Sequence, residues 1–222
     1  MKKALIIMLI GLNLGVLPVS RVRADENMNS YTLSENNIVY KMEKKTVIID
    51  YCHRAVNPNG IIDRGASSKL YGRVYYEDDI ANDISHDIGK KLEEKGYNVI
   101  YTRSIDGTIS LTERVKMCNE IPDSSLYFSL HLNATEKHNA SGTMGFSNTQ
   151  QELNEMLTKK LSTKYGFKNK GIHEDPYYTR RIKNSVLYEL GFIDSKEDLE
   201  IILNNQKNIA NDIAEIIDNY LN

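Results

Sequence analysis

Strand-like and helix-like segments alternate along this chain, and that alternation restricts its possible folds more than any other feature. Short apolar runs typical of buried strands are separated by segments whose apolar residues recur every three or four positions, the spacing of an amphipathic helix. We therefore predict an α/β fold with a largely parallel, mixed sheet of about six strands and helices on both faces.

The boundaries of the predicted elements come from apolar spacing and from residues that start or stop helices. Ser110 and Glu113 form the pattern of a capping box, and Gly96 and Gly166 each follow a helical stretch. The predicted strands span residues 46–50, 98–103, 126–131, 143–147 and 185–193. The predicted helices span residues 76–95, 111–119, 153–161, 196–203 and 209–221.

The first residues have the pattern of a secretion signal. Lys2 and Lys3 precede an apolar stretch at 4–17, and Val22-Arg23-Ala24 is typical of a cleavage site. We predict three parts: a secretion signal at 1–24, a linker or N-terminal arm at 25–45, and a catalytic domain at 46–222. We accordingly expect a secreted protein, extracellular or associated with the cell wall, with no membrane contact after cleavage.

Charge and cysteine content exclude two classes of protein. Four of the 28 Lys and Arg residues lie in the signal, which leaves 24 against 30 acidic residues, a formal charge of −6. A nucleic-acid-binding protein would show a basic face instead. The two cysteines, Cys52 and Cys118, allow one bridge but no disulfide framework. Cys52 adjoins His53, an arrangement also found for metal thiolates and nucleophiles, but we interpret Cys52 as a small buried residue.

Glu189 interrupts the otherwise apolar run 185–193. An ionised carboxylate removed from water needs a partner or a metal, or it stays protonated through a raised pKa. A metal-bound carboxylate and a carboxyl group with a raised pKa are both typical of active sites. The alternative is a glutamate on an edge strand that points to solvent.

Two histidines and a second glutamate lie where predicted strands end or a helix begins. His53 follows the first strand and His131 ends the third. Because ligands gather at the carboxyl ends of parallel strands, we expect the two imidazoles to form a metal site. Catalytic zinc uses three protein ligands, and Glu77 is the third candidate, although acids are common in any first helical turn.

Several motifs together resemble the zinc-dependent N-acetylmuramoyl-L-alanine amidases of the amidase type 3 family, from Thr46 to Asn222. They are His53, Asp63-Arg64-Gly65-Ala66, Glu77, Thr102-Arg103, Ser110-Leu111-Thr112-Glu113-Arg114, Ser129-Leu130-His131-Leu132-Asn133-Ala134, Ser141-Gly142 and Val186-Leu187-Tyr188-Glu189-Leu190-Gly191-Phe192-Ile193.

The resemblance implies a zinc-exopeptidase-like fold and hydrolysis of the amide between N-acetylmuramic acid and L-alanine of peptidoglycan. It implies that His53, Glu77 and His131 bind Zn²⁺, that Glu189 is the catalytic carboxylate, and that Asn133 helps to hold substrate. Affinity for the wall would come from the groove itself or from a targeting partner. His86, His138 and His173 we interpret as residues that do not bind metal.

The loop around His53 departs from the family pattern. Where the family has D-P-G-H-G-G, this chain has Asp50-Tyr51-Cys52-His53-Arg54-Ala55. His53 also stands ten residues before Asp63 instead of four, which indicates an insertion. Because glycine permits backbone conformations that other residues resist, we expect the loop to take a different path.

Three other functions fit parts of the pattern. An inactive relative would act as a peptidoglycan-binding module. A secreted zinc carboxypeptidase would need an arginine for the free carboxylate, and Arg180 or Arg181 would supply it. A cysteine hydrolase built on Cys52 or Cys118 has the least support.

Overall fold

A computed structural model describes residues 22–24, 30–33, 38–41, 45–121 and 124–222. The chain divides into two units, residues 1–43 and 44–222. In the first unit, β1 (Val22–Ala24), β2 (Ser30–Leu33) and β3 (Ile38–Lys41) pair as an antiparallel sheet. Most of the predicted secretion signal, residues 1–21, lies outside the described residues, and the predicted arm contains β2 and β3.

None of the helices among the described residues combines the length and the apolar character that crossing a membrane requires.

The second unit is built on a six-stranded sheet with the order β10-β9-β11-β8-β4-β7. The strands β11, β8, β4 and β7 are parallel, whereas β9 runs antiparallel to β11. Their bounds are β4 Thr46–Asp50, β7 Asn98–Tyr101, β8 Ser124–Asn133, β9 Thr143–Phe146, β10 Asn169–His173 and β11 Ser185–Phe192. The predicted α/β fold with a largely parallel, mixed sheet is confirmed.

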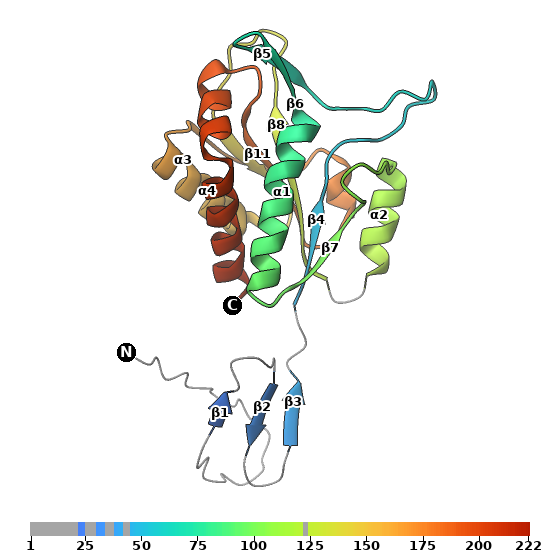
Figure 1. The fold of residues 1–222 in the computed structure, drawn as a ribbon, viewed down its shortest axis with the longest axis vertical. Coiled ribbons are helices and arrows are strands. Elements are labelled where there is room, and N and C mark those ends of the chain that lie inside the picture. The colour runs from blue at the N-terminus through green and yellow to red at the C-terminus, as the bar shows by residue number, and fades with distance from the viewer. Residues whose placement is uncertain (1–21, 25–29, 34–37, 42–44, 122–123) are drawn as a thin grey trace. The chain divides into compact units, whose positions relative to one another are not determined.

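Helices cover both faces of this sheet, as predicted. The helices α1 (Glu77–Glu94), α3 (Gln151–Tyr165) and α4 (Lys196–Leu221) enclose the main core on one face, and Figure 1 shows α1 and α4 side by side. On the other face, Cys118 of α2 (Leu111–Glu120) packs with Ile48 and Tyr127. The capping box of Ser110 and Glu113 at the start of α2 is present.

The C-terminal segment corrects one prediction. Residues 196–221 form the single helix α4 and not two helices. The polar run at 204–208 suggested a break, but it contains neither Gly nor Pro and most of it is solvent-accessible, so the helix continues through it.

In the second unit, four elements were not predicted. They are the antiparallel pair β5 (Ser67–Leu70) and β6 (Arg73–Tyr76), the strand β10, and the 3₁₀ helix η1 (Tyr178–Arg181). The pair β5 and β6 is largely exposed and lacks the apolar alternation of a core strand, so the sequence pattern gave no signal there.

The sheet register brings the polar residues of neighbouring strands together. Asp50 pairs with Ser129 across β4 and β8, and Glu189 pairs with His131 across β11 and β8. Side chains alternate between the two faces, so these four residues share the face that carries Ile48, Tyr127 and Leu187. Their place at the carboxyl ends of parallel strands makes this edge of the sheet the candidate site.

Candidate metal centre and hydrolytic site

Two imidazoles and one carboxylate oxygen converge at this edge of the sheet. Glu77 Oε1 lies 2.9 Å from His53 Nε2 and 2.9 Å from His131 Nδ1. With Cys52, these residues offer ligand atoms that all lie within 4.8 Å of one another. The structure therefore brings all three predicted metal ligands together and adds a cysteine to them.

Glu77 is held by backbone amides from two directions. Its Oε2 accepts from Ala66 N at 2.9 Å, and its Oε1 accepts from Leu132 N at 3.1 Å. It is the first residue of α1, where the helix dipole favours a negative charge. Burial opposes ionisation, but His131 and His53 hold the pKa of Glu77 well below its usual range. The carboxylate is therefore fixed and charged.

Hydrogen bonds on the far side of each ring determine which nitrogen faces Glu77. His53 Nδ1 lies 3.2 Å from Asp63 Oδ2, an acceptor, so Nδ1 carries the hydrogen and Nε2 keeps its lone pair. His131 Nε2 lies 3.1 Å from Ser129 Oγ. Because Ser129 donates its own hydrogen to Asp50 Oδ2 at 2.8 Å, it accepts one from His131 Nε2. In the neutral rings, both lone pairs therefore point at Glu77.

A cation fits between these acceptors. His53 Nε2 is buried and lacks a hydrogen-bond partner among the described residues, despite its short distance to Glu77. Burial lowers the pKa of His53, yet Glu77 and Asp63 outweigh it and raise the pKa to about 9. The site thus attracts a proton, and a metal ion would compete for the same lone pairs. Nitrogen and oxygen donors at this spacing could hold a metal ion.

Glu189 lies in the centre of the sheet and not on its edge, which contradicts the exposed interpretation. Only 7% of it is solvent-accessible, and its Oε2 has no hydrogen-bond partner among the described residues. Burial, with a smaller contribution from Glu77, raises the pKa of Glu189 to about 7 against the opposing effect of the histidines. Glu189, His53, Glu77 and His131 line one cavity of about 320 Å³. A carboxyl group with this pKa can accept and release a proton near neutral pH.

Two buried arginines hold the loop that carries His53. Arg103 donates to the carbonyl oxygens of Tyr51 and Cys52 at 3.0 and 2.9 Å, and Arg114 donates to those of Tyr51 and His53. Arg114 also pairs with buried Asp50, behind the cluster. Guanidinium groups thus fix the backbone of this loop on the cavity side of the sheet.

The insertion after His53 is closed at its base. Arg54 N donates to Asp63 O, and Asp63 N donates to Ala55 O, both at 2.8 Å. Figure 1 shows the segment between β4 and β5 extending away from the sheet. Arg54 takes a left-handed conformation (φ 60°), although glycine is absent there. The two ends of the inserted segment therefore meet beside His53.

Gly65 lies so close to the cluster that no side chain fits. A Cβ atom there would stand 2.4 Å from Glu77 Oε2 and 2.5 Å from His53 Cδ2, and its φ is +69°. Only glycine lets the backbone pass between the metal-site residues at this point.

The remaining predicted residues lie as follows. Asn133 lines the same cavity, next to His131. Cys52 and Cys118 are both buried and free, so neither forms a bridge in this structure. None of the other three histidines joins the cluster, since His86 contacts Tyr51, His138 contacts Asp194 and His173 contacts Lys170. Arg180 and Arg181 belong to η1 and are exposed.

The residues that orient the two histidine rings were not predicted from the sequence. Ser129 and Asp50 act behind His131, Asp63 behind His53, and Tyr177 lines the cavity. Their signal was weak because a polar residue at a strand end has many ordinary uses. The face shared by Asp50, Ser129 and His131 was readable from their alternation, but their contact depends on the strand order.

This chain is similar in sequence to one family of enzymes and to several known proteins. Residues 47–219 match the Amidase_3 family, described as N-acetylmuramoyl-L-alanine amidase. Over 189 residues the chain is 30% identical to the uncharacterized protein YqiI of Bacillus subtilis, covering 81% of this chain and 86% of that protein. It is 29% identical to the probable cell wall amidase LytH of Staphylococcus saprophyticus, covering 82% of this chain and 56% of that protein.

A solved structure of an amidase has a similar fold. An N-acetylmuramoyl-L-alanine amidase from Clostridium difficile 630 superposes with a TM-score of 0.69 at 26% identity, covering 80% of this chain and 97% of that one.

Proposed function

This chain belongs to the N-acetylmuramoyl-L-alanine amidase family and is a cell-wall amidase, and we propose that His53, Glu77 and His131 hold a zinc ion beside the catalytic carboxylate Glu189. Its reaction is hydrolysis of the amide between N-acetylmuramic acid and L-alanine of the peptidoglycan stem peptide. The observation that carries the assignment is the convergence of both imidazole lone pairs on Glu77 Oε1, each at 2.9 Å.

The donor set supports zinc as the metal. Two histidine nitrogens and one carboxylate oxygen, with room for a further ligand, are typical of catalytic zinc sites in hydrolases. When bound, zinc polarises a carbonyl oxygen and acidifies water. Asp63 and Ser129 orient the two rings so that the required nitrogens face the ion.

Glu189 supplies proton transfer. Its unpartnered Oε2 takes a proton from the attacking water and then delivers it to the nitrogen of the leaving L-alanine. The raised pKa of Glu189, about 7 in the metal-free protein, suits both steps, and a nearby cation would lower it. Asn133 lines the cavity close to His131 and helps to hold the substrate there.

We further propose that the chain acts outside the cytoplasm, on the cell wall. This part rests on the pattern of residues 1–24, with Lys2, Lys3 and the apolar stretch that follows them. Mass spectrometry of the protein from its native host should find an N-terminus near Asp25.

Product analysis tests the reaction. Purified protein is incubated with muropeptides, and the products are identified by mass spectrometry. We expect free peptides that begin with L-alanine, loss of activity with a chelator, and recovery with zinc. Release of single C-terminal amino acids would indicate a carboxypeptidase, and binding without any release would indicate an inactive binding module. Either result would contradict the proposal.

A further inference from the structure

A second groove adjoins the cavity that holds the metal cluster. It has a volume of about 530 Å³, and it shares Leu111 and Tyr177 with that cavity. Its walls come from α2 and from the segment that contains η1, two elements in contact with each other. In Figure 1 the short orange helix η1 lies partly behind β4, near α2. A substrate held at the metal cluster would therefore extend into this groove.

The groove is positively charged. Lys116, Arg180 and Arg181 line it, and no acidic residue does. Across the described part of the chain, no carboxylate lies within ion-pair distance of Arg180 or Arg181, and Lys116 reaches only Glu120, at 3.9 Å. Arg54 and Arg64, by contrast, are paired with Asp78. The arginines of the groove thus keep their charge available to a ligand.

The backbone that carries these arginines is well anchored. Buried Asp175 accepts from Tyr177 N at 2.7 Å and also from the Thr179 hydroxyl. Asn119 Nδ2 of α2 donates to Arg181 O at 2.9 Å, and Ile182 packs into the apolar cluster beneath α2. A preorganised backbone lowers the entropy lost when a ligand binds.

We propose that this groove binds the stem peptide beyond L-alanine and that Arg180 and Arg181 recognise the free α-carboxylate of the second residue. The inference rests on the proposed function, since it takes the substrate to be a muramyl peptide. The hydroxyl and N-acetyl groups of the glycan are neutral, whereas the peptide carries the carboxylates. Guanidinium groups bind carboxylates through paired hydrogen bonds, and Tyr177 and Leu111 offer apolar contact between groove and metal cluster.

Two substrates that differ in a single group test this assignment. N-acetylmuramoyl-L-alanyl-D-glutamate carries an α-carboxylate that is an amide in N-acetylmuramoyl-L-alanyl-D-isoglutamine, and both keep the γ-carboxylate. We expect the wild type to prefer the acid about tenfold in kcat/KM. The double variant R180Q/R181Q should lose that preference through a higher KM for the acid, with the zinc content unchanged.

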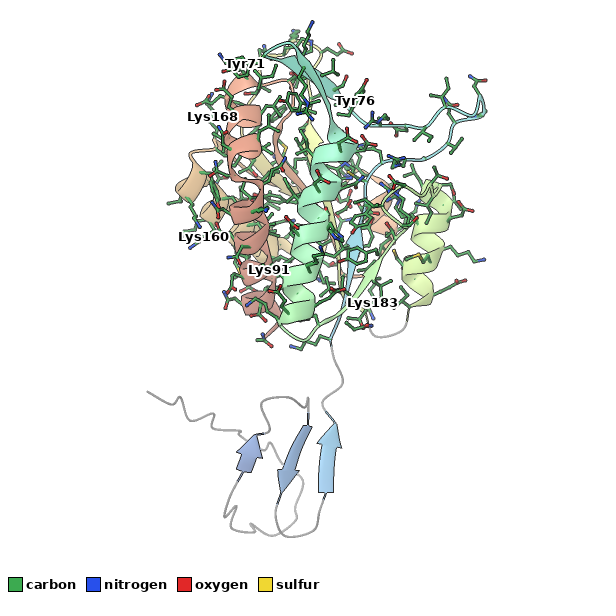
Figure 2. The ribbon with its side chains drawn as sticks, viewed as in Figure 1. Tyr71, Tyr76, Lys91, Lys160, Lys168 and Lys183 are labelled. Carbon is green, nitrogen blue, oxygen red and sulfur yellow. The ribbon has the colours of Figure 1, made fainter. Side chains whose placement is uncertain are left out.

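A matched variant controls for overall charge. Lys159 and Lys160 are exposed on α3, and Figure 2 shows Lys160 on the opposite side of the view from α2. K159Q/K160Q removes the same charge and should keep the preference for the acid. Equal losses for both substrates in R180Q/R181Q, or an unchanged preference, would overturn the inference.

A binding measurement separates this inference from the proposed function. Isothermal titration of both substrates into E189Q reports recognition without turnover. If hydrolysis fails but E189Q binds the acid more tightly through Arg180 and Arg181, only the proposed function is contradicted. Equal binding of acid and amide contradicts the carboxylate assignment even if hydrolysis occurs.

Discussion

The metal cluster joins two regions that are built in different ways. His131 and Glu189 come from β8 and β11, and the parallel register of those strands places them opposite each other. His53 and Glu77 come from a loop and from a helix start, with an excursion of the chain between them. We refer to these as the sheet half, His131 and Glu189, and the loop half, His53 and Glu77.

The two halves depend on different interactions. Backbone pairing positions the sheet half, and any sequence that keeps the register keeps its geometry. The loop half depends on individual side chains and on one glycine, since Arg103 and Arg114 hold the backbone beside His53 and Gly65 leaves room for the cluster. Strand pairing therefore positions the sheet half, whereas the loop half needs particular side chains and one glycine.

The largest expected effect comes from a residue of the loop region that touches no metal. Gly65→Ala places a Cβ against Glu77 and His53, so zinc affinity should fall by more than the roughly 10–100-fold typical when an outer partner of a metal ligand is lost. Gly60→Ala is the control, because Gly60 has a similar φ of +76° but open space around it. A competitive zinc titration checks both. Equal affinities for the two variants would contradict the close approach.

In the sheet half, Glu189 should make the free energy of unfolding depend on pH. Because folding raises the pKa of Glu189 from about 4.5 to about 7, the folded metal-free protein keeps a proton there that the unfolded chain releases. The contribution of Glu189 to the free energy of unfolding is therefore fully present below about pH 4.5 and is lost as pH rises through about 7. Relative to wild type, Glu189→Gln should gain up to about 3 kcal/mol of unfolding free energy between pH 5 and pH 8.

Urea unfolding at several pH values measures this gain in the absence of metal. Glu136→Gln, which alters an exposed glutamate, should follow the wild type at every pH. A constant difference between Glu189→Gln and wild type would mean that burial does not perturb this carboxyl group.

The outer hydrogen bonds allow a direct comparison of the halves. Asp63→Ala removes the acceptor behind His53, and Ser129→Ala removes the one behind His131. Each should weaken zinc binding about 10–100-fold, with the larger loss for Asp63→Ala because the loop lacks support from strand pairing. Zinc titration of both variants provides the comparison. A larger loss for Ser129→Ala would show that the register alone does not hold His131.

The smallest effect is expected from shortening the insertion. Replacing residues 56–61 with two glycines leaves the backbone bonds between Arg54, Ala55 and Asp63 in place. Zinc affinity should then stay within about threefold of wild type, because the removed residues are all exposed. A loss comparable to that of Asp63→Ala would show that the excursion itself supports the loop half.

The sequence pointed to residues of both halves through local signals. Apolar runs identified β4, β8 and β11, the rule that ligands gather at strand ends then indicated His53 and His131, and an acid inside an apolar run indicated Glu189. Helix spacing likewise found α1 and Glu77 at its start. These signals are local, so a single sequence contains them.

The contacts that complete the site are not local. Asp50 lies 79 residues from Ser129, and Arg114 lies 61 residues from His53, so no spacing rule links them. The exposed pair β5 and β6 lacks the apolar alternation of a core strand, and the polar run inside α4 has the composition of a loop. The family resemblance supplied the ligand set, but the basic groove beside Tyr177 emerged only from the packing of η1 against α2.

Metal content and product release, measured side by side for wild type and Glu189→Gln, test the central claim most directly. We expect both proteins to bind one zinc ion per chain. We expect the wild type to release peptides beginning with L-alanine from muropeptides and the variant to release them at least about 100-fold more slowly. Full activity in Glu189→Gln, or loss of its zinc, would contradict the division of labour between the three ligands and the catalytic carboxylate.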